Sequence, residues 1–335
     1  MMKISGGRIA FFVFGIAVFV YLVVRFGVDQ ILMNIHRAGW SLLYVILVWL
    51  AIYLLNALAW KLVLGGQGKK VTFVQLFMVT VSGFVINYIT PLIAVGGEPY
   101  KVKALSGKLG GQQSLSAVVL YRMVHLLGHM LLLFAGIVAA ILVLLLPMTM
   151  NLVLGGIALV ILLVIMLTLI GHRDGIFKKL ERLLTRIRFL RRFTQGFLKY
   201  QSDVQEMDRV ITDVYHHDRG RFALAIACEF FSRLLMGIEV YLILQGIGVE
   251  TTIVSALFLY VVYSVVINLL FFIPLNLGAR EGGLALGLGS LALPPLLGVY
   301  IGIVMRIREF FWILLGLLFI LLTTDREKTA PAKTA

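Results

Sequence analysis

Residues 114–146 read SLSAVVLYRMVHLLGHMLLLFAGIVAAILVLLL, a mostly apolar run that ends before Pro147. As one α-helix this run would be about 50 Å long, whereas about 20 apolar residues suffice to cross about 30 Å of hydrocarbon. The run therefore predicts either one tilted, protruding helix or two short helices.

The composition of the whole chain agrees with a membrane location. Of 335 residues, 61% are hydrophobic and only 14% are charged, whereas soluble domains are about a quarter charged. Such a chain lacks the polar surface of a soluble protein and the polarity of a disordered one. The single cysteine, Cys228, also excludes a disulfide-stapled secreted domain. The sequence therefore predicts an all-α, polytopic transmembrane helix bundle.

Other apolar runs have the length of a membrane span. They cover residues 9–26, 41–64, 72–90, 151–170, 222–245, 252–273 and 296–322. Residues 284–294 are too few to cross, are rich in Gly and Leu, and are followed closely by Pro295. This profile is typical of a half-helix or re-entrant segment.

Basic residues outnumber acidic ones by 30 to 16, which gives a net charge of +14. In so apolar a chain this excess indicates cytoplasmic loops facing anionic lipid, and we expect no nucleic-acid binding. The polar region 171–221 is the strongest candidate for such a loop. Its first half has the pattern of a basic amphipathic helix, which either lies on the membrane surface or packs on the bundle. Its predicted membrane-surface residues are Lys178, Lys179, Arg182 and Arg186.

The region 171–221 also divides the chain. We predict an N-terminal membrane half over residues 1–170, the cytoplasmic connector over 171–221, a C-terminal membrane half over 222–323 and a polar tail over 324–335.

The two membrane halves share a motif at an offset of 183 residues. PLIAVGGE at 91–98 aligns with PLNLGARE at 274–281, so that Pro, Leu and Glu coincide. The preceding spans match in order, and an arginine follows each glutamate: Arg122 after Glu98 and Arg306 after Glu281. Repeated halves are common in transporters, which bind their substrates between them. We therefore predict an internal repeat.

Each copy of the motif combines helix breakers with an acid. Proline ends a helix, glycine permits unusual backbone and close approach, and a new helix N-terminus favours anions. The predicted helix-break residues are Pro91, Gly96, Gly97, Pro274, Gly278 and Gly282. The alternative is that these residues mark turns at the membrane surface and that Glu98 merely caps its helix.

Ionisable residues also interrupt the apolar runs: Arg122, Glu229, Arg233, Glu239, Arg306, Arg308 and Glu309. Each is costly in hydrocarbon, at roughly 2.5–3.5 kcal/mol for a central arginine, so these residues usually pair or line a cavity. Glu229 and Arg233 have the spacing to neutralise each other on one helix. The expected partners of Arg122 and Arg306 are Glu98 and Glu281, or an anionic ligand such as a phosphate.

His125 and His129 are four residues apart, but Leu126 stands where the HExxH zinc motif has its glutamate. We expect packing or hydrogen bonds here and no metal. Nucleotide-binding and hydrolase motifs are likewise absent from the sequence. We therefore expect no cofactor, no catalytic residues and no enzymatic activity.

These motifs resemble the lysylphosphatidylglycerol synthase transmembrane, or flippase-like, family over residues 5–325. The resemblance rests on GGEPYK at 96–101, on Tyr121-Arg122, on LGAREG at 277–282 and on Arg306. Relatives often have an arginine after the acid of the first motif, so the resemblance implies that Lys101 takes that basic role here. Longer members translocate aminoacylated phosphatidylglycerol across the cytoplasmic membrane and carry a soluble synthase domain after the bundle. Because this sequence ends at Ala335, we expect no synthase activity.

The leading hypothesis is a flippase in a bacterial or archaeal cytoplasmic membrane. It would move an anionic phospholipid or lipid-linked amphiphile through a polar cavity between the repeats. The predicted substrate-binding residues are Glu98, Lys101, Arg122, Arg280, Glu281 and Arg306. One alternative is a scaffold or partner subunit of a separately encoded lipid-modifying enzyme or glycosyltransferase. Another is an intramembrane enzyme that uses Glu98 and Glu281 as acid and base.

Overall fold

The computed structural model describes residues 38–89, 96–174, 218–271, 273–276 and 278–325, and the isolated residues Asp29, Met33 and His36. All regular elements in these ranges are helices: nine α-helices and two short 3-10 helices. Several sequence predictions fall outside the described residues. They are the span 9–26, Pro91, most of the connector 171–221 with its residues Lys178, Lys179, Arg182 and Arg186, and most of the polar tail 324–335.

Six described elements precede the connector. They are α3 (Trp40–Leu64), η1 (Gly65–Lys70), α4 (Phe73–Ile89), α5 (Gly97–Leu109), α6 (Gly111–Val143) and α7 (Met148–Asp174). The apolar run that begins at Ser114 therefore lies mostly in one continuous helix of 33 residues, α6, and not in two short ones.

Five described elements follow the connector. They are α11 (Arg219–Gly246), α12 (Ile253–Leu269), η2 (Pro274–Asn276), α13 (Ala279–Ser290) and α14 (Leu297–Asp325). The 12 residues of α13 reach about 18 Å, which is too short to cross a bilayer, as predicted for this segment.

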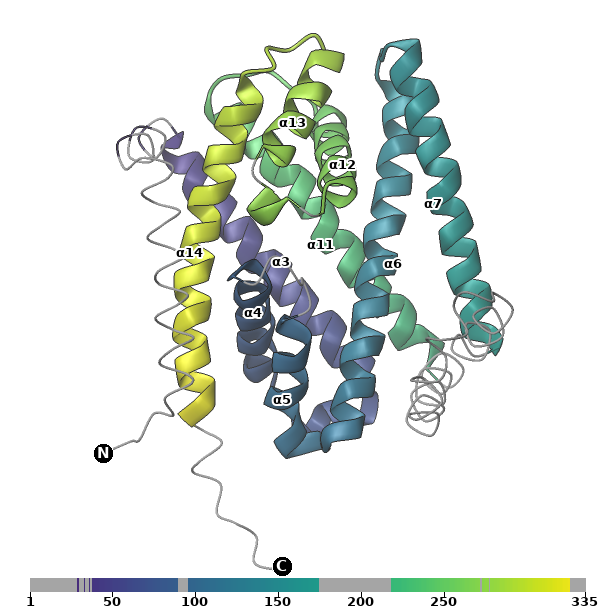
Figure 1. Cartoon of the computed structure of the whole chain (residues 1–335), viewed down its shortest axis with the longest axis vertical. Helices are drawn as coiled ribbons and strands as arrows, with labels where there is room; N and C mark the ends of the chain where they lie inside the picture. Colours follow the sequence, from purple (N-terminus) through teal and green to yellow (C-terminus); the bar gives the residue numbers. More distant parts are fainter. Residues whose placement is uncertain are drawn as a thin grey trace, which may run out of the picture.

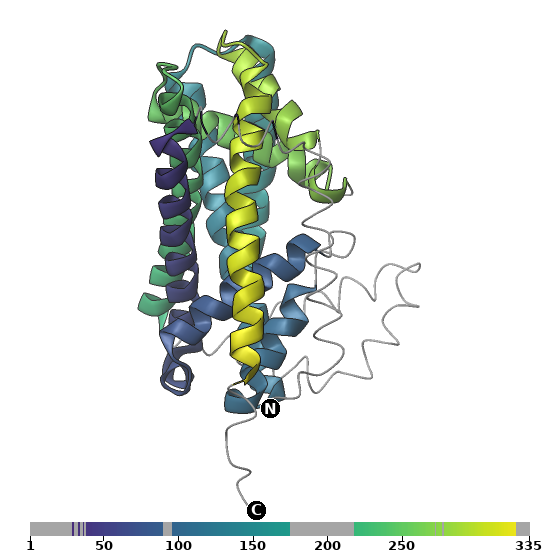
Figure 2. The ribbon, with the colours of Figure 1, turned by 90° about the vertical axis from the view of Figure 1, so that its left-hand side faces the viewer.

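The halves have the same order of elements. The series α3, α4, α5, α6 and the series α11, α12, α13, α14 each run long helix, 17-residue helix, short helix, long helix. Helices α3 and α11 pack side by side (Figure 2), α14 packs on α4, and α6 packs on α12. The pair α4–α5 lies toward one end of the bundle and the pair α12–α13 toward the other (Figure 1). This shared order is the one expected of an internal repeat, which stays a prediction.

Apolar helices and an apolar outer surface make the chain an integral membrane protein. Among the described residues, three helical stretches are long and apolar enough to span: Trp40–Lys70, Gly111–Val143 and Met148–Met166. Helices α11 and α14 are of similar length, with 28 and 29 residues, but carry ionisable groups. On α7, large apolar side chains such as Leu152 and Leu159 are more than half exposed, as expected of a surface that faces lipid.

The first helix break is built on close packing between α4 and α5. The Gly97 N–H donates to Asn87 Oδ1 at 2.8 Å, which satisfies a free amide at the start of α5. A Cβ at Gly97 would lie 2.5 Å from the carbonyl oxygen of Gly83, so glycine is required at this contact. The break thus holds Glu98 in the first turn of α5.

The second helix break uses left-handed backbone. Leu275, Asn276 and Gly278 have φ values of 58°, 52° and 79°. The Gly278 N–H donates to Glu281 Oε2 at 2.9 Å, which caps α13. Arg306 Nη1 donates to the carbonyl oxygen of Leu275 at 3.3 Å, so the interrupted backbone has a partner inside the bundle.

Candidate functional site

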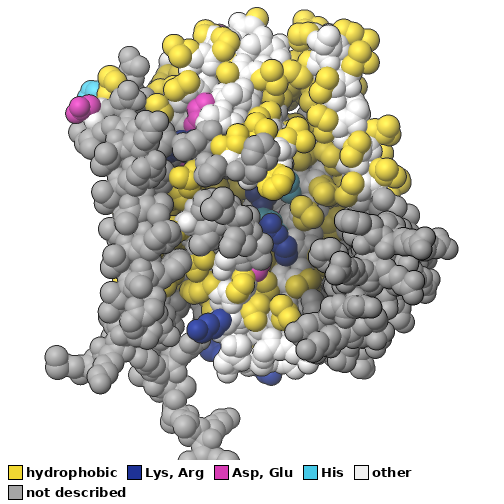
Figure 3. Space-filling model, in the orientation of Figure 1, with side chains coloured by type: hydrophobic (Ala, Val, Ile, Leu, Met, Phe, Trp, Pro, Cys, Tyr) yellow, Lys and Arg dark blue, Asp and Glu magenta, His cyan; other side chains and the backbone are white. Residues whose placement is uncertain are grey.

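A pocket of about 190 Å³ opens among helices α3, α4, α5, α6 and α11. Figure 3 shows Lys and Arg side chains near the middle of one face, with apolar side chains above and below them. The pocket is lined by Trp49, Tyr53, Asn56, Thr80, Phe84, Asn87, Glu98, Lys101, Val118, Tyr121, Arg122, His125, Arg233 and Met236.

One side of the pocket carries the charged residues of the first repeat copy. Glu98 Oε1 lies 3.5 Å from Arg122 Nη1 and 4.0 Å from Lys101 Nζ. The Arg122 side chain is 55% exposed, so this ion pair is loosely held. Lys101 is buried, and its Nζ lies 5.8 and 5.5 Å from the ring centroids of Trp60 and Tyr121. The aromatic rings stabilise the buried ammonium by cation–π attraction.

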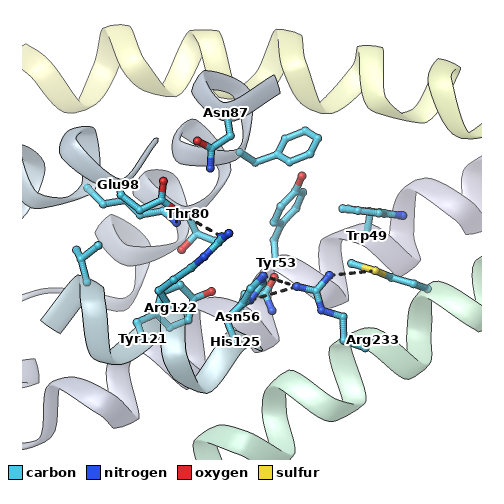
Figure 4. Close-up of a pocket in the computed structure, with 14 residues that line it drawn as sticks. Trp49, Tyr53, Asn56, Thr80, Asn87, Glu98, Tyr121, Arg122, His125 and Arg233 are labelled. Atoms are coloured by element: carbon cyan, nitrogen blue, oxygen red, sulfur yellow. Dashed lines mark hydrogen bonds and ion pairs between the residues drawn. The ribbon is translucent and has the colours of Figure 1, made fainter. Parts of the chain in front are cut away.

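Arg233 enters the pocket from the other side, on α11 (Figure 4). Its guanidinium donates to His125 Nε2 and, at 3.4 Å, to Met236 Sδ, while its buried Nε has no hydrogen-bond partner. Within the described residues, Arg233 forms no ion pair with a carboxylate. The predicted pairing with Glu229 on the same helix is therefore not found.

His125 lies between Glu229 and Arg233 and contacts both of them. Its Nδ1 is 2.7 Å from Glu229 Oε2, and the same oxygen accepts from Asn56 Nδ2 at 3.0 Å. The contact depends on Gly128, one turn further along α6, where a Cβ would lie 2.5 Å from Glu229 Cβ. Only glycine lets α6 approach α11 so closely that His125 reaches Glu229.

A second cluster of charges lies beside the pocket, and all of its members are buried except the half-buried Glu281. Three arginines each contact a glutamate: Arg280 with Glu309 at 2.7 Å, Arg306 with Glu281 at 2.8 Å, and Arg308 with Glu239 at 2.8 Å.

Trp49 joins this cluster to the pocket. Its Nε1 donates to Glu239 Oε2 at 2.8 Å, and the Arg308 guanidinium lies 3.7 Å from its ring centroid.

The structure therefore places the six predicted substrate-binding residues in two groups. Glu98, Lys101 and Arg122 line the pocket. Arg280, Glu281 and Arg306 lie in the second cluster and do not contribute to the pocket lining. The Glu98–Arg122 and Glu281–Arg306 contacts join the residues that the sequence spacing had paired.

Sequence reasoning did not assign Arg233, His125 or Trp49 to a binding site. The available signal was the rarity of an arginine within an apolar run, which marks Arg233 as either paired or functional. The aromatic residues of α3 gave no signal, because nearly every position of that helix is apolar.

The pocket has the charge to bind an anion. Three cationic side chains, Lys101, Arg122 and Arg233, line it together with one carboxylate, Glu98. Guanidinium groups can present two parallel donors to a phosphate or carboxylate. Among the described residues, no group of three His, Cys, Asp or Glu side chains is placed to hold a metal ion.

Comparison with known proteins adds one match. A family model described as "Lysylphosphatidylglycerol synthase TM region" matches residues 8–316. No curated protein matches the chain. No solved structure matches it either.

Proposed function

The chain belongs to the lysylphosphatidylglycerol synthase transmembrane family, and on this premise we propose that it is a flippase for a phosphate-bearing lipid. The headgroup binds in the pocket between α5, α6 and α11, and the acyl or prenyl chains remain in the bilayer. We propose that the chain has no catalytic role and that it acts in a bacterial or archaeal cytoplasmic membrane.

The observation that carries this proposal is the state of Arg233. The buried arginines Arg280, Arg306 and Arg308 each contact a carboxylate within 2.8 Å. Arg233, which lines the pocket, donates instead to a neutral imidazole and a thioether and keeps an unsatisfied Nε. A cation held in an apolar bundle without a carboxylate in contact is ready to accept an anionic group from a ligand.

The size of the pocket supports a headgroup and not a whole lipid as its occupant. At about 190 Å³ it is smaller than the roughly 300–1,000 Å³ of sites that enclose a drug-sized ligand. Trp49, Tyr53 and Phe84 form an apolar wall, and Asn56, Thr80 and Asn87 add neutral hydrogen-bonding groups. The lipid tails must then extend outside the pocket.

The two helix breaks support movement between leaflets. They interrupt the chain before α5 and before α13, and the helix pairs that flank them, α4–α5 and α12–α13, lie toward opposite ends of the bundle (Figure 1). In transporters with inverted repeats, related broken helices open a central site to each side in turn. We infer that the two halves alternate in this way.

Leaflet exchange in reconstituted vesicles tests the proposal. Fluorescent phosphatidylglycerol is incorporated in both leaflets, and a membrane-impermeant reductant bleaches the lipid that reaches the outer leaflet. Arg233→Gln should slow exchange at least tenfold, because one charge-assisted contact to the phosphate contributes about 1.5–3 kcal/mol.

The matched control is Arg221→Gln, on the same helix. Arg221 pairs with Asp218 at 3.0 Å in an exposed contact outside the pocket, so its loss should leave exchange unchanged. Exchange at the wild-type rate in well-folded Arg233→Gln would count against the pocket as the headgroup site.

A further inference from the structure

The hydrogen bonds around His125 define its protonation state. Arg233 Nη2 lies nearest to Nε2 and 3.3 Å from Nδ1, and a guanidinium can only donate, so at least one ring nitrogen must accept. Nδ1 also lies 2.7 Å from Glu229 Oε2, which is an acceptor, so the proton lies on Nδ1 and Nε2 accepts from Arg233. His125 is a neutral imidazole while Arg233 contacts it.

Protonation of His125 and its contact with Arg233 exclude each other. A protonated imidazole has a donor on both nitrogens, and a guanidinium facing Nε2–H would meet a second donor and a like charge. His125 can thus gain a proton only when Arg233 has moved away.

Arg233 is held weakly enough to move. Its contacts are the two nitrogens of the His125 ring, the soft sulfur acceptor of Met236 and the Tyr260 hydroxyl, none of which carries a negative charge, while its Nε makes no hydrogen bond. A phosphate in the pocket offers this guanidinium a stronger, charge-assisted contact. When Arg233 turns to such an anion, Nε2 of His125 is left facing the pocket.

A positive His125 would then have an opposite charge beside it. Glu229 is fully buried and remains in contact with Nδ1, and Arg122 is paired with Glu98. The charged and titratable groups that face His125 or its immediate neighbours are Glu229 and Arg233 on α11, Tyr121, Arg122 and His129 on α6, Glu98 and Lys101 on α5, and Tyr260 on α12. Of these, Glu229 is the carboxylate in direct contact with the ring.

We propose that His125 is a proton-binding site that is loaded when an anionic headgroup draws Arg233 away. The proton comes from solvent and binds Nε2, so one negative charge and one proton enter the pocket together. This inference rests on the proposed function and adds a coupling ion to it. It also gives a role to the contacts that position His125. Glu229 contacts its Nδ1, Asn56 donates to the same carboxylate oxygen, and Gly128 lets α6 approach Glu229 closely.

Calorimetric titration of the detergent-solubilised full chain with dioctanoyl phosphatidylglycerol provides the test. Titrations in two buffers of different ionisation enthalpy give the number of protons taken up per lipid bound. We expect uptake approaching one proton per lipid, with affinity rising as the pH falls by up to tenfold per pH unit. His125→Gln should bind the lipid without proton uptake.

The matched control is His129→Gln. His129 lies one turn away on the same helix, contacts Tyr260 Oη at 3.3 Å, and does not line the pocket. Proton uptake should survive this change.

Each outcome separates the two proposals. If wild-type protein does not bind the lipid, the headgroup site itself is refuted. Binding without proton uptake, or uptake that persists in His125→Gln, overturns the proton site and leaves the headgroup site intact. Should His125→Gln not fold, ¹⁵N spectra of histidine-labelled wild type decide: lipid must convert His125 from its Nδ1–H form to the doubly protonated form. An unchanged spectrum with lipid bound refutes the proton site.

Discussion

Replacement of Glu239 by glutamine should destabilise the bundle more than any single surface change. Glu239 is fully buried and contacts Arg308 Nη2 at 2.8 Å and Trp49 Nε1 at 2.8 Å. Glutamine keeps the shape and an acceptor for Trp49 but removes the charge. Arg308 is then left 2% exposed with Glu309 at 3.7 Å, a carboxylate that already contacts Arg280. A buried ion pair that loses one partner costs about 3–5 kcal/mol.

Unfolding in mixed micelles, followed by circular dichroism as dodecyl sulfate is added, measures this loss. The control Glu250→Gln removes an exposed carboxylate in the α11–α12 loop and should change the unfolding free energy by less than about 0.5 kcal/mol.

A double variant, Glu239→Leu with Arg308→Met, isolates the cause. It removes both charges, so it should cost less than Glu239→Gln alone, because no uncompensated charge stays buried. The reasoning is refuted if Glu239→Gln is as stable as the control, or if the double variant is the less stable of the two.

Three further changes probe the helix break, the α6–α11 contact and the pocket. Gly278→Ala should lower the unfolding free energy by about 1–2 kcal/mol, because φ at this position is 79°. The control Gly282→Ala, at an exposed helical position, should leave the unfolding free energy unchanged or raise it in the same assay. Gly128→Val should separate α6 from Glu229 and lower the free energy of unfolding by about 1–3 kcal/mol. A thermal melting curve like that of the wild type would contradict the close contact. Lys101→Met should change the unfolding free energy by less than about 1 kcal/mol or raise it, because it removes a buried charge. It should nevertheless weaken binding of dioctanoyl phosphatidylglycerol about tenfold in calorimetry. Undiminished affinity would exclude Lys101 from the headgroup site.

The sequence predicted the helices well because their signal is local. Apolar runs of spanning length and breakers such as Gly278 and Pro274 act on the segment that contains them, and both helix breaks are found where the repeated motif lies. The pairing of Arg306 with Glu281 also followed from the sequence, because the two copies of the motif carried the same acid and arginine.

The partner of Glu229 could not be predicted in this way. Spacing of four residues placed Arg233 on the same helical face, but His125, 104 residues earlier, lies between the two groups. That position depends on how closely α6 and α11 approach, which Gly128 permits and no local pattern reveals. For the same reason, the sequence could not tell that Arg280, Glu281 and Arg306 lie beside the pocket and do not line it.

The length of α6 has a consequence for the energetics of crossing. The helix runs from Gly111 to Val143, and its centre is Leu127, so Arg122 and His125 lie only about 8 and 3 Å from the centre along its axis. When α6 is centred on the bilayer, each of these two groups therefore lies at nearly the same distance from one water phase as from the other. A polar group bound at this depth would face free-energy barriers of similar height toward the two water phases. The position of the site alone would therefore favour neither leaflet.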